Sequence, residues 1–149
     1  MKTMRFDGRE VNQHHSGLVY AKNFCRLLKV IPALEREVHV ADAGVSRSEG
    51  FMDLHVDVME NNDESVVIAM AHYFEQNGDK VPDPDMTVRL WRNGLAEALS
   101  FQDSTTYREV YPEPGKVNLV AKKELNSFLS LWLRNLVNQG HKVETLGSD

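Results

Sequence analysis

One stretch of the sequence carries metal-ligand side chains at strand spacing. In FMDLHVDVME, Asp53, His55 and Asp57 alternate with apolar residues, so they share one strand face at intervals of about 6.6 Å. Carboxylates and imidazoles are metal ligands, but at this spacing one ion needs a further ligand from a neighbouring strand. The candidate metal site is therefore Asp53, His55, Asp57 and His72. The simpler alternative, which we favour, is the solvated face of a half-buried strand.

A second group of acids lies in EQNGDKVPDPD, a stretch with the composition of a loop. Its oxygen atoms are of the type that calcium prefers, but their order does not match an EF-hand. Pro82 and Pro84 restrict the backbone, and restricted loops often carry binding residues. We predict a stiff, solvated turn whose candidate binding residues are Glu75, Asn77, Asp79, Asp83 and Asp85.

Glu97 is the one acid on an otherwise apolar face of a predicted hairpin. Asn93-Gly94 between MTVRLW and LAEALSF is a strong signal for a two-residue turn. With this turn as the centre, Leu90 faces Glu97. A buried lone acid can act as a general acid or base, but no second catalytic group lies at a readable spacing. We expect Glu97 instead to reach water at the sheet end or to pair with an arginine such as Arg92.

Aromatic and basic residues are interleaved in the second half of the chain. Such a pattern can stack on and neutralise single-stranded nucleic acid. The group consists of Trp91, Arg92, Tyr107, Arg108 and Tyr111, followed by Lys116, Lys122 and Lys123. Acids interrupt it, and the chain's net charge of -5 argues against nucleic acid as a partner. A mixed-charge surface is the alternative that we favour, with Trp91, Arg92, Tyr107 and Arg108 as candidate binding residues.

The composition fits one ordinary domain of 149 residues, with 42% hydrophobic and 26% charged residues. No Ser/His/Asp set, phosphate-binding loop or zinc ribbon is present, and we expect no cofactor. The single cysteine, Cys25, excludes an internal disulfide and indicates a cytoplasmic protein; we expect it to be a small core residue. No apolar run is long enough to span a membrane, and residues 1–15 are predicted to be a flexible tail.

Hydrophobic periodicity predicts an α+β fold. Ser16 can cap a first helix that ends before Pro32, and Asn118 can cap a long last helix that Gly140 closes. The first helix has its predicted core stripe at Leu18, Ala21, Phe24, Cys25, Leu28 and Ile31. Between the helices, four or five strands with short links, the first at residues 38–41, predict an antiparallel meander. Both helices are predicted to pack on one face of that sheet.

The last helix carries apolar residues beyond its main stripe, namely Leu131, Leu133 and Val137. A helix that is apolar on more than one face usually contacts a second partner. The first helix of the same chain is the preferred partner, and a second subunit is the alternative, which makes a homodimer through this helix possible in principle.

The second half of the chain resembles a known family. HYFEQNGDKVPDPDMTVRLW, AEALSFQDSTTYREVYPEPGK and KKELNSFLSLWLRNLVNQGH are similar in layout to the YqiB-like family of uncharacterised proteins from bacterial chromosomes, plasmids and phages. The similarity covers residues 24–141, with matching positions at Met86, Val88, Arg89, Ala96, Glu97, Tyr111, Pro112, Asn126, Phe128, Leu129, Trp132 and Leu133. Chromosomal relatives carry His-Asp in the turn where this chain has Arg92-Asn93-Gly94, which weakens turn-borne acid/base chemistry here.

The resemblance implies no known activity, but its mobile-element members suggest a host-interaction or anti-defence role. Our first hypothesis is a non-enzymatic accessory protein that binds another macromolecule, most plausibly a protein. The alternatives are a small metal-assisted enzyme or ligand-binding protein that uses the Asp53/His55/Asp57 face, and a single-stranded nucleic-acid binder. No membrane association is expected.

Overall fold

One antiparallel sheet dominates the part of the chain that the computed structural model describes, residues 17–148. Within these residues six strands pair in chain order, each with the next. They are β1 (Ala43–Ser46), β2 (Leu54–Asn61), β3 (Ser65–Gln76), β4 (Asp79–Trp91), β5 (Leu95–Gln102) and β6 (Tyr107–Glu109). The predicted meander is confirmed with one or two more strands than expected. The first strand lies after its predicted position at residues 38–41. The stretch that forms β6 was not predicted to be a strand.

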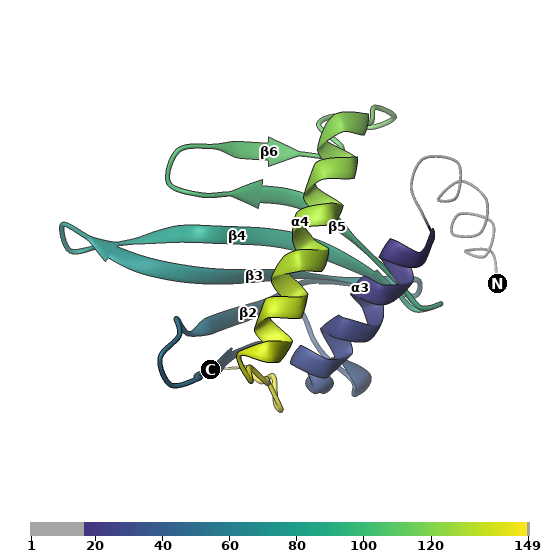
Figure 1. Cartoon of the computed structure of the whole chain (residues 1–149). Helices are drawn as coiled ribbons and strands as arrows, with labels where there is room; N and C mark the ends of the chain where they lie inside the picture. Colours follow the sequence, from purple (N-terminus) through teal and green to yellow (C-terminus); the bar gives the residue numbers. More distant parts are fainter. Residues whose placement is uncertain (1–16, 149) are drawn as a thin grey trace.

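Within residues 17–148, two helices cover one face of the sheet and no helix covers the other (Figure 1). They are α3 (Gly17–Val30) and α4 (Leu119–Asn138), and a short 3-10 helix, η2 (Pro32–Glu35), follows α3. The main core lies between α3, α4 and the inner face of the sheet. The predicted α+β class and the packing of both helices on one face are therefore confirmed. No helix within residues 17–148 is long and apolar enough to cross a membrane.

The first helix is turned from its predicted orientation. Its fully buried residues are Tyr20, Asn23, Leu27 and Val30, which recur at helical spacing. Leu18 of the predicted stripe is 60% exposed, and Cys25 is exposed rather than part of the core. The prediction was wrong in part, since Ile31 of the stripe is fully buried and Phe24 packs against the core. The buried face differs because it includes a polar residue, Asn23, which a search for apolar periodicity does not count. The predicted cap at Ser16 and the tail lie outside the described residues.

The last helix follows its sequence pattern closely. The Asn118 side chain accepts a hydrogen bond from the Ala121 N–H at 3.0 Å, so the predicted cap is confirmed. The helix buries Leu125, Leu129, Trp132 and Leu136 of its predicted stripe. Of its extra apolar residues, Leu133 is buried, Val137 packs against the core and Leu131 is 46% exposed. Since α3 and α4 contact each other, the helix's expected partner within the chain is confirmed.

The strands β3 and β4 form a long hairpin that extends beyond the rest of the molecule (Figure 1). Its turn is Asn77-Gly78, with φ of 54° and 87°, which matches the two positive φ values of a tight hairpin turn. Residues 75–85 were predicted to be a loop, and this was wrong, because they form the outer ends of both strands. Here His72 lies opposite two residues, Asp83 and Pro84, so the proline occupies a bulge where pairing is interrupted.

Candidate binding groove on the open face of the sheet

A groove of about 630 Å³ lies over β4, β5 and β6 on the face that the helices leave open. Polar, charged and aromatic side chains line it: Thr87, Arg89, Trp91, Glu97, Leu99, Ser100, Tyr107, Glu109 and Tyr111. We call this the Glu97 groove. It combines three aromatic rings with polar groups on a concave surface, which is typical of binding sites.

Glu97 is buried in this groove, with 2% of its surface exposed. Its Oε1 accepts a hydrogen bond from Trp91 Nε1 at 3.2 Å, and its Oε2 accepts one from the Tyr111 hydroxyl at 2.8 Å. Within residues 17–148 no lysine or arginine forms an ion pair with it. The expected pairing with Arg92 is therefore wrong. A buried carboxylate held by two neutral donors is an unusual arrangement, because burying a charge without a counter-charge is costly.

A bulge in β5 turns Glu97 toward the open face. Thr87 pairs with Ser100, but Val88 then pairs with Ala98, so Leu99 is an extra residue. Glu97 consequently lies opposite Arg89 instead of Leu90. A side chain of α4 stabilises the bulge by a hydrogen bond to its backbone.

The side chain that stabilises the bulge is the buried amide of Asn126. Asn126, which is fully buried, accepts a hydrogen bond from the Ala98 N–H at 2.8 Å and donates to the Lys122 carbonyl at 2.7 Å. A bulge leaves backbone groups without ladder partners, and a side-chain amide can satisfy them. The position of Glu97 thus depends on a residue 29 positions later in the chain, on the opposite face of the sheet.

Arg89 lies beside Glu97 but is engaged elsewhere. Its guanidinium donates to Ser65 Oγ at 2.7 Å and lies 3.7 Å from a carboxylate oxygen of Glu60. The same guanidinium lies over the Trp91 ring, 5.5 Å from its centroid, at the distance of a cation–π contact. Arg89 therefore fixes the Trp91 ring while Glu60 balances its charge.

Two tyrosines form the exposed wall of the groove. Tyr107 is 58% exposed and Tyr111 is 38% exposed. The Tyr107 hydroxyl donates to Glu109 Oε2 at 3.1 Å. Partial burial, together with the hydrogen bond to Glu109, raises the pKa of Tyr107 above its usual value, so its hydroxyl stays a neutral donor at neutral pH. The wall thus consists of two aromatic rings whose hydroxyl groups donate hydrogen bonds to carboxylates.

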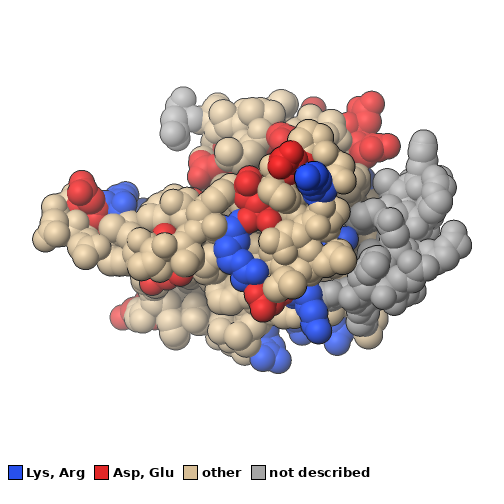
Figure 2. All heavy atoms as spheres, turned by 90° about the horizontal axis from the view of Figure 1, so that it is seen from above, with Lys and Arg blue, Asp and Glu red and all other residues tan. Residues whose placement is uncertain are grey.

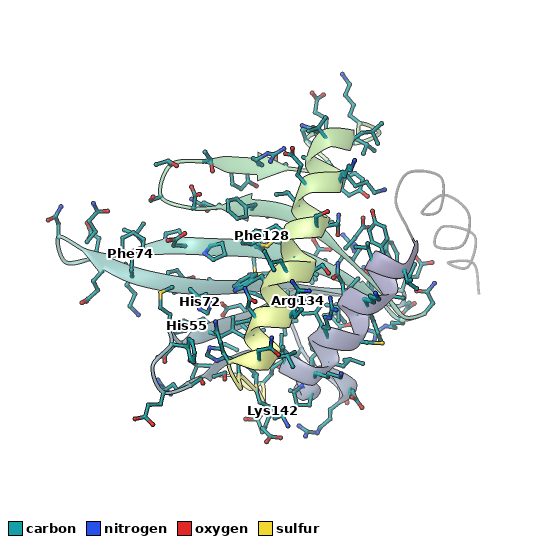
Figure 3. The ribbon with its side chains drawn as sticks, in the orientation of Figure 1. His55, His72, Phe74, Phe128, Arg134 and Lys142 are labelled. Atoms are coloured by element: carbon teal, nitrogen blue, oxygen red, sulfur yellow. The ribbon has the colours of Figure 1, made fainter. Side chains whose placement is uncertain are left out.

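The four residues predicted to share a metal do not come together. His55 and Asp57 lie on the open face, paired with Ala71 and Ala69 of β3, whereas Asp53 lies 3.3 Å from Arg47. Among the described residues, no group of three or more His, Cys, Asp or Glu side chains is arranged to hold a metal ion. Figure 3 shows His55 and His72 on neighbouring strands.

His72 is buried on the helix side of the sheet and both of its nitrogens are occupied. Its Nδ1 lies 2.8 Å from the Asp53 carbonyl oxygen, and its Nε2 accepts from Trp132 Nε1 at 3.2 Å. Because the indole only donates, Nε2 is unprotonated and Nδ1 is the donor. The His141 ring lies 6.0 Å away, with its Nδ1 2.9 Å from Ser46 Oγ. We call Ser46, His72, Trp132 and His141 the histidine cluster.

The acids of the predicted loop lie on the projecting hairpin. Glu75 and Asp79 are exposed near its turn, next to Lys80, while Asp83 is exposed and Asp85 is half-buried further in. Figure 2 shows acidic and basic groups together at this tip. Burial, and secondarily Asp57, raises the pKa of Asp85. None of Glu75, Asn77, Asp79, Asp83 and Asp85 lines the Glu97 groove, and their role in binding stays a prediction.

The predicted aromatic and basic group is divided between surfaces. Trp91, Tyr107 and Tyr111 line the Glu97 groove. Arg92 instead donates to the Asn62 carbonyl at 2.9 Å and lines a separate groove of about 430 Å³. Arg108 pairs with Glu124 of α4 at 2.8 Å. Sequence reasoning did not assign Thr87, Arg89, Leu99, Ser100 or Glu109 to a site. The alternation of Thr87 and Arg89 with apolar residues indicates only that these two share a strand face.

The fold and the groove together define a small α+β protein with a helix-covered sheet and a partly aromatic open face. Residues 22–142 match the model of a family described as a domain of unknown function, DUF6908. This match covers most of the chain, so the chain belongs to that family. Searches of curated proteins and of solved structures found no match.

Proposed function

We propose that this chain is a non-enzymatic accessory protein that binds a protein partner through the open face of its sheet. The observation that carries the proposal is the Glu97 groove, where a buried carboxylate and three aromatic side chains line one hollow. Tyrosine, tryptophan and arginine are the residues that most often dominate binding energy at protein interfaces. They lie here on the face without helices.

No specific observation favours either alternative function. A metal-assisted enzyme would need Asp53, His55 and Asp57 to converge with a fourth ligand, and His72 has both nitrogens engaged. A nucleic-acid binder would need a basic surface. Figure 2 instead shows acidic and basic side chains interspersed on the face it presents, and the groove has two glutamates against one arginine.

The finer parts of the proposal come from the sequence. The resemblance of residues 24–141 to the YqiB-like family supports a bacterial, plasmid or phage origin and a host-interaction or anti-defence role in the cytoplasm. A homodimer through α4 would use Leu131, which is exposed on that helix. These points extend the proposal and do not carry it.

The test compares two surface variants in a capture experiment from host lysate. Ser100→Arg fills the groove, and Leu131→Arg places the same charge on α4 as a matched control. Proteins that bind the wild type and Leu131→Arg but not Ser100→Arg are identified, purified and tested for direct binding. We expect at least one purified protein to bind with about tenfold lower affinity to Ser100→Arg. If every partner binds all three chains equally, the open face is not the binding surface.

Partner loss that follows Leu131→Arg alone would favour α4 as the interface. Sedimentation of the wild type and Leu131→Arg then tests the homodimer, because a dimer through this helix would dissociate in the variant.

A further inference from the structure

We propose that the Glu97 groove receives the guanidinium group of an arginine from the partner. This inference rests on the proposed function and names the chemistry of its binding site. The bound guanidinium would lie between the tyrosine wall and Glu97, with its charge balanced by the carboxylates of the groove.

The charge of Glu97 is not compensated within the described residues. Its two hydrogen-bond donors, Trp91 and Tyr111, are neutral, and no cation of the described chain pairs with it. The guanidinium that lies opposite in the strand register, that of Arg89, is already matched with Glu60. Glu97 and Glu109 therefore leave the groove with surplus negative charge. A buried carboxylate gains most from a partner cation, because screening by water is weak there.

The carboxylate of Glu97 also retains acceptor sites for further hydrogen bonds. A carboxylate offers about four lone-pair sites on its two oxygens. In Glu97 each oxygen accepts one hydrogen bond from a described residue, so each retains capacity for another. Two parallel N–H groups of a guanidinium match one further bond to each oxygen. An ammonium group lacks this planar fork, which is why arginine rather than lysine fits.

Aromatic rings lie around that carboxylate. Guanidinium groups stack on aromatic faces, and Arg89 already does so on the Trp91 ring at 5.5 Å. Tyr107 and Tyr111 are the exposed rings of the same groove. Since the Tyr111 hydroxyl donates to Glu97, a cation against this ring would also be held close to the carboxylate. Because Glu97 is 2% exposed, an outward rotation of the partly exposed Tyr111 would open the path to it. An N–H of the guanidinium would then replace the Tyr111 hydroxyl as the donor to Glu97 Oε2.

The experiment titrates the full chain with three blocked tripeptides that carry arginine, lysine or citrulline at the centre. Citrulline has nearly the shape of arginine without its charge. The chain has two tryptophans, so two indole N–H signals report binding by NMR. The Trp91 signal comes from the groove, and the Trp132 signal, from the buried histidine cluster, is an internal control. We expect arginine to shift only the Trp91 signal in a saturable manner, with at least fivefold weaker binding of lysine and no saturable binding of citrulline.

Three variants test the role of the carboxylate. Glu97→Gln should weaken arginine binding at least tenfold, whereas Glu124→Gln, the same change at an acid of the helix face, should alter it less than twofold. Ser100→Arg supplies a guanidinium from within the chain and should abolish binding even if Glu97→Gln folds poorly. Equal binding of arginine and citrulline, or unchanged arginine binding by Glu97→Gln or Ser100→Arg, would overturn the inference.

These outcomes separate the inference from the proposed function. If the purified partner still depends on the groove but arginine does not bind, the open face is an interface for other chemistry. If arginine binds but no partner depends on the groove, the guanidinium site stands without the proposed protein interface.

Discussion

Two buried polar clusters lie on opposite faces of the same sheet and are built in different ways. On the open face, Glu97 brings a carboxylate together with Trp91 and Tyr111 below a groove. On the helix face, the histidine cluster places His72 between the Asp53 carbonyl and Trp132, covered by α4. Each cluster contains one tryptophan whose indole N–H donates to a titratable group. The environments of those two tryptophans differ.

The two clusters differ in their access to solvent and in their charge. In the histidine cluster the groups are aromatic rings and a hydroxyl, and Trp132 is buried against the core. Around Glu97 a charged group lies below partly exposed tyrosines. Burial of a titratable group therefore does not by itself mark a site, because structural networks also bury such groups. The combination of a charge without a counter-ion and an adjoining groove distinguishes the Glu97 side.

The largest expected effect comes from the residue that connects the two faces, Asn126. Replacing it with alanine leaves the Ala98 N–H without a partner in the core and opens a cavity. We expect the free energy of unfolding to fall by about 2–4 kcal/mol, measured by urea denaturation. Ser127→Ala, at the exposed neighbouring position, should change it by less than about 0.5 kcal/mol. A loss below about 1 kcal/mol for Asn126→Ala would mean that the bulge does not depend on this amide.

A matched pair of substitutions compares the clusters directly. Trp132→Phe removes the donor to His72 in a closed core, and we expect it to destabilise the fold by about 1–3 kcal/mol. Trp91→Phe removes the donor to Glu97, but water from the groove can replace that donor. Its expected cost is about 0–1 kcal/mol. Urea denaturation measures both, and equal losses would contradict the distinction between a closed and an accessible cluster.

The two Asn-Gly turns show what the sequence can and cannot predict. Asn93-Gly94 was recognised because both flanking strands alternate between apolar and polar residues above a core. The structure corrects its type, because Trp91 pairs with Leu95 and the turn therefore has three residues, 92–94, with positive φ at Gly94 but not at Asn93. Asn77-Gly78 does form a two-residue turn, with positive φ at both residues. The outer hairpin extends past the helices (Figure 1), so no core imposes alternation there. Acids and prolines fill it instead and suggest a loop. In Figure 3, Phe74 lies on this extension, whereas Phe128 projects from α4.

The site was only partly predictable for a related reason. Glu97 was identified as an unusual acid on an apolar face, and Trp91, Tyr107 and Tyr111 were grouped as aromatics. The sequence did not indicate that Glu97 and these aromatics lie together. Their meeting depends on the bulge at Leu99, which reverses the facing of Glu97 within its strand. Asn126, in a distant helix, satisfies that bulge. Alternation is a local pattern, so it cannot report a register shift that a distant residue stabilises.

The pH dependence of stability offers a third comparison. Burial, and secondarily the nearby His72, lowers the pKa of His141 below its usual value of 6.5. In the unfolded chain His141 therefore binds a proton at a higher pH than in the folded chain. The free energy of unfolding should fall as the pH decreases below about 6.5, and this loss should level off once the folded form also protonates.

Denaturation at about pH 7.5 and about pH 5.5 measures this loss. His141→Gln should lose less stability over that range than the wild type. His39→Gln, at a largely exposed histidine, should behave as the wild type does. If all three chains show the same dependence, His141 does not account for it.

The smallest expected effect on stability concerns Glu97, where the binding effect should be largest. Glu97→Gln removes a buried charge, which relieves its desolvation cost, but it also weakens the hydrogen bonds from Trp91 and Tyr111. These changes oppose each other, so the net change in unfolding free energy should stay within about 1 kcal/mol. A stabilising change would show that the fold tolerates this charge at a cost, as expected for a group retained for binding. A loss above about 3 kcal/mol would instead give Glu97 a structural role comparable to that of the histidine cluster and remove the contrast between the two faces.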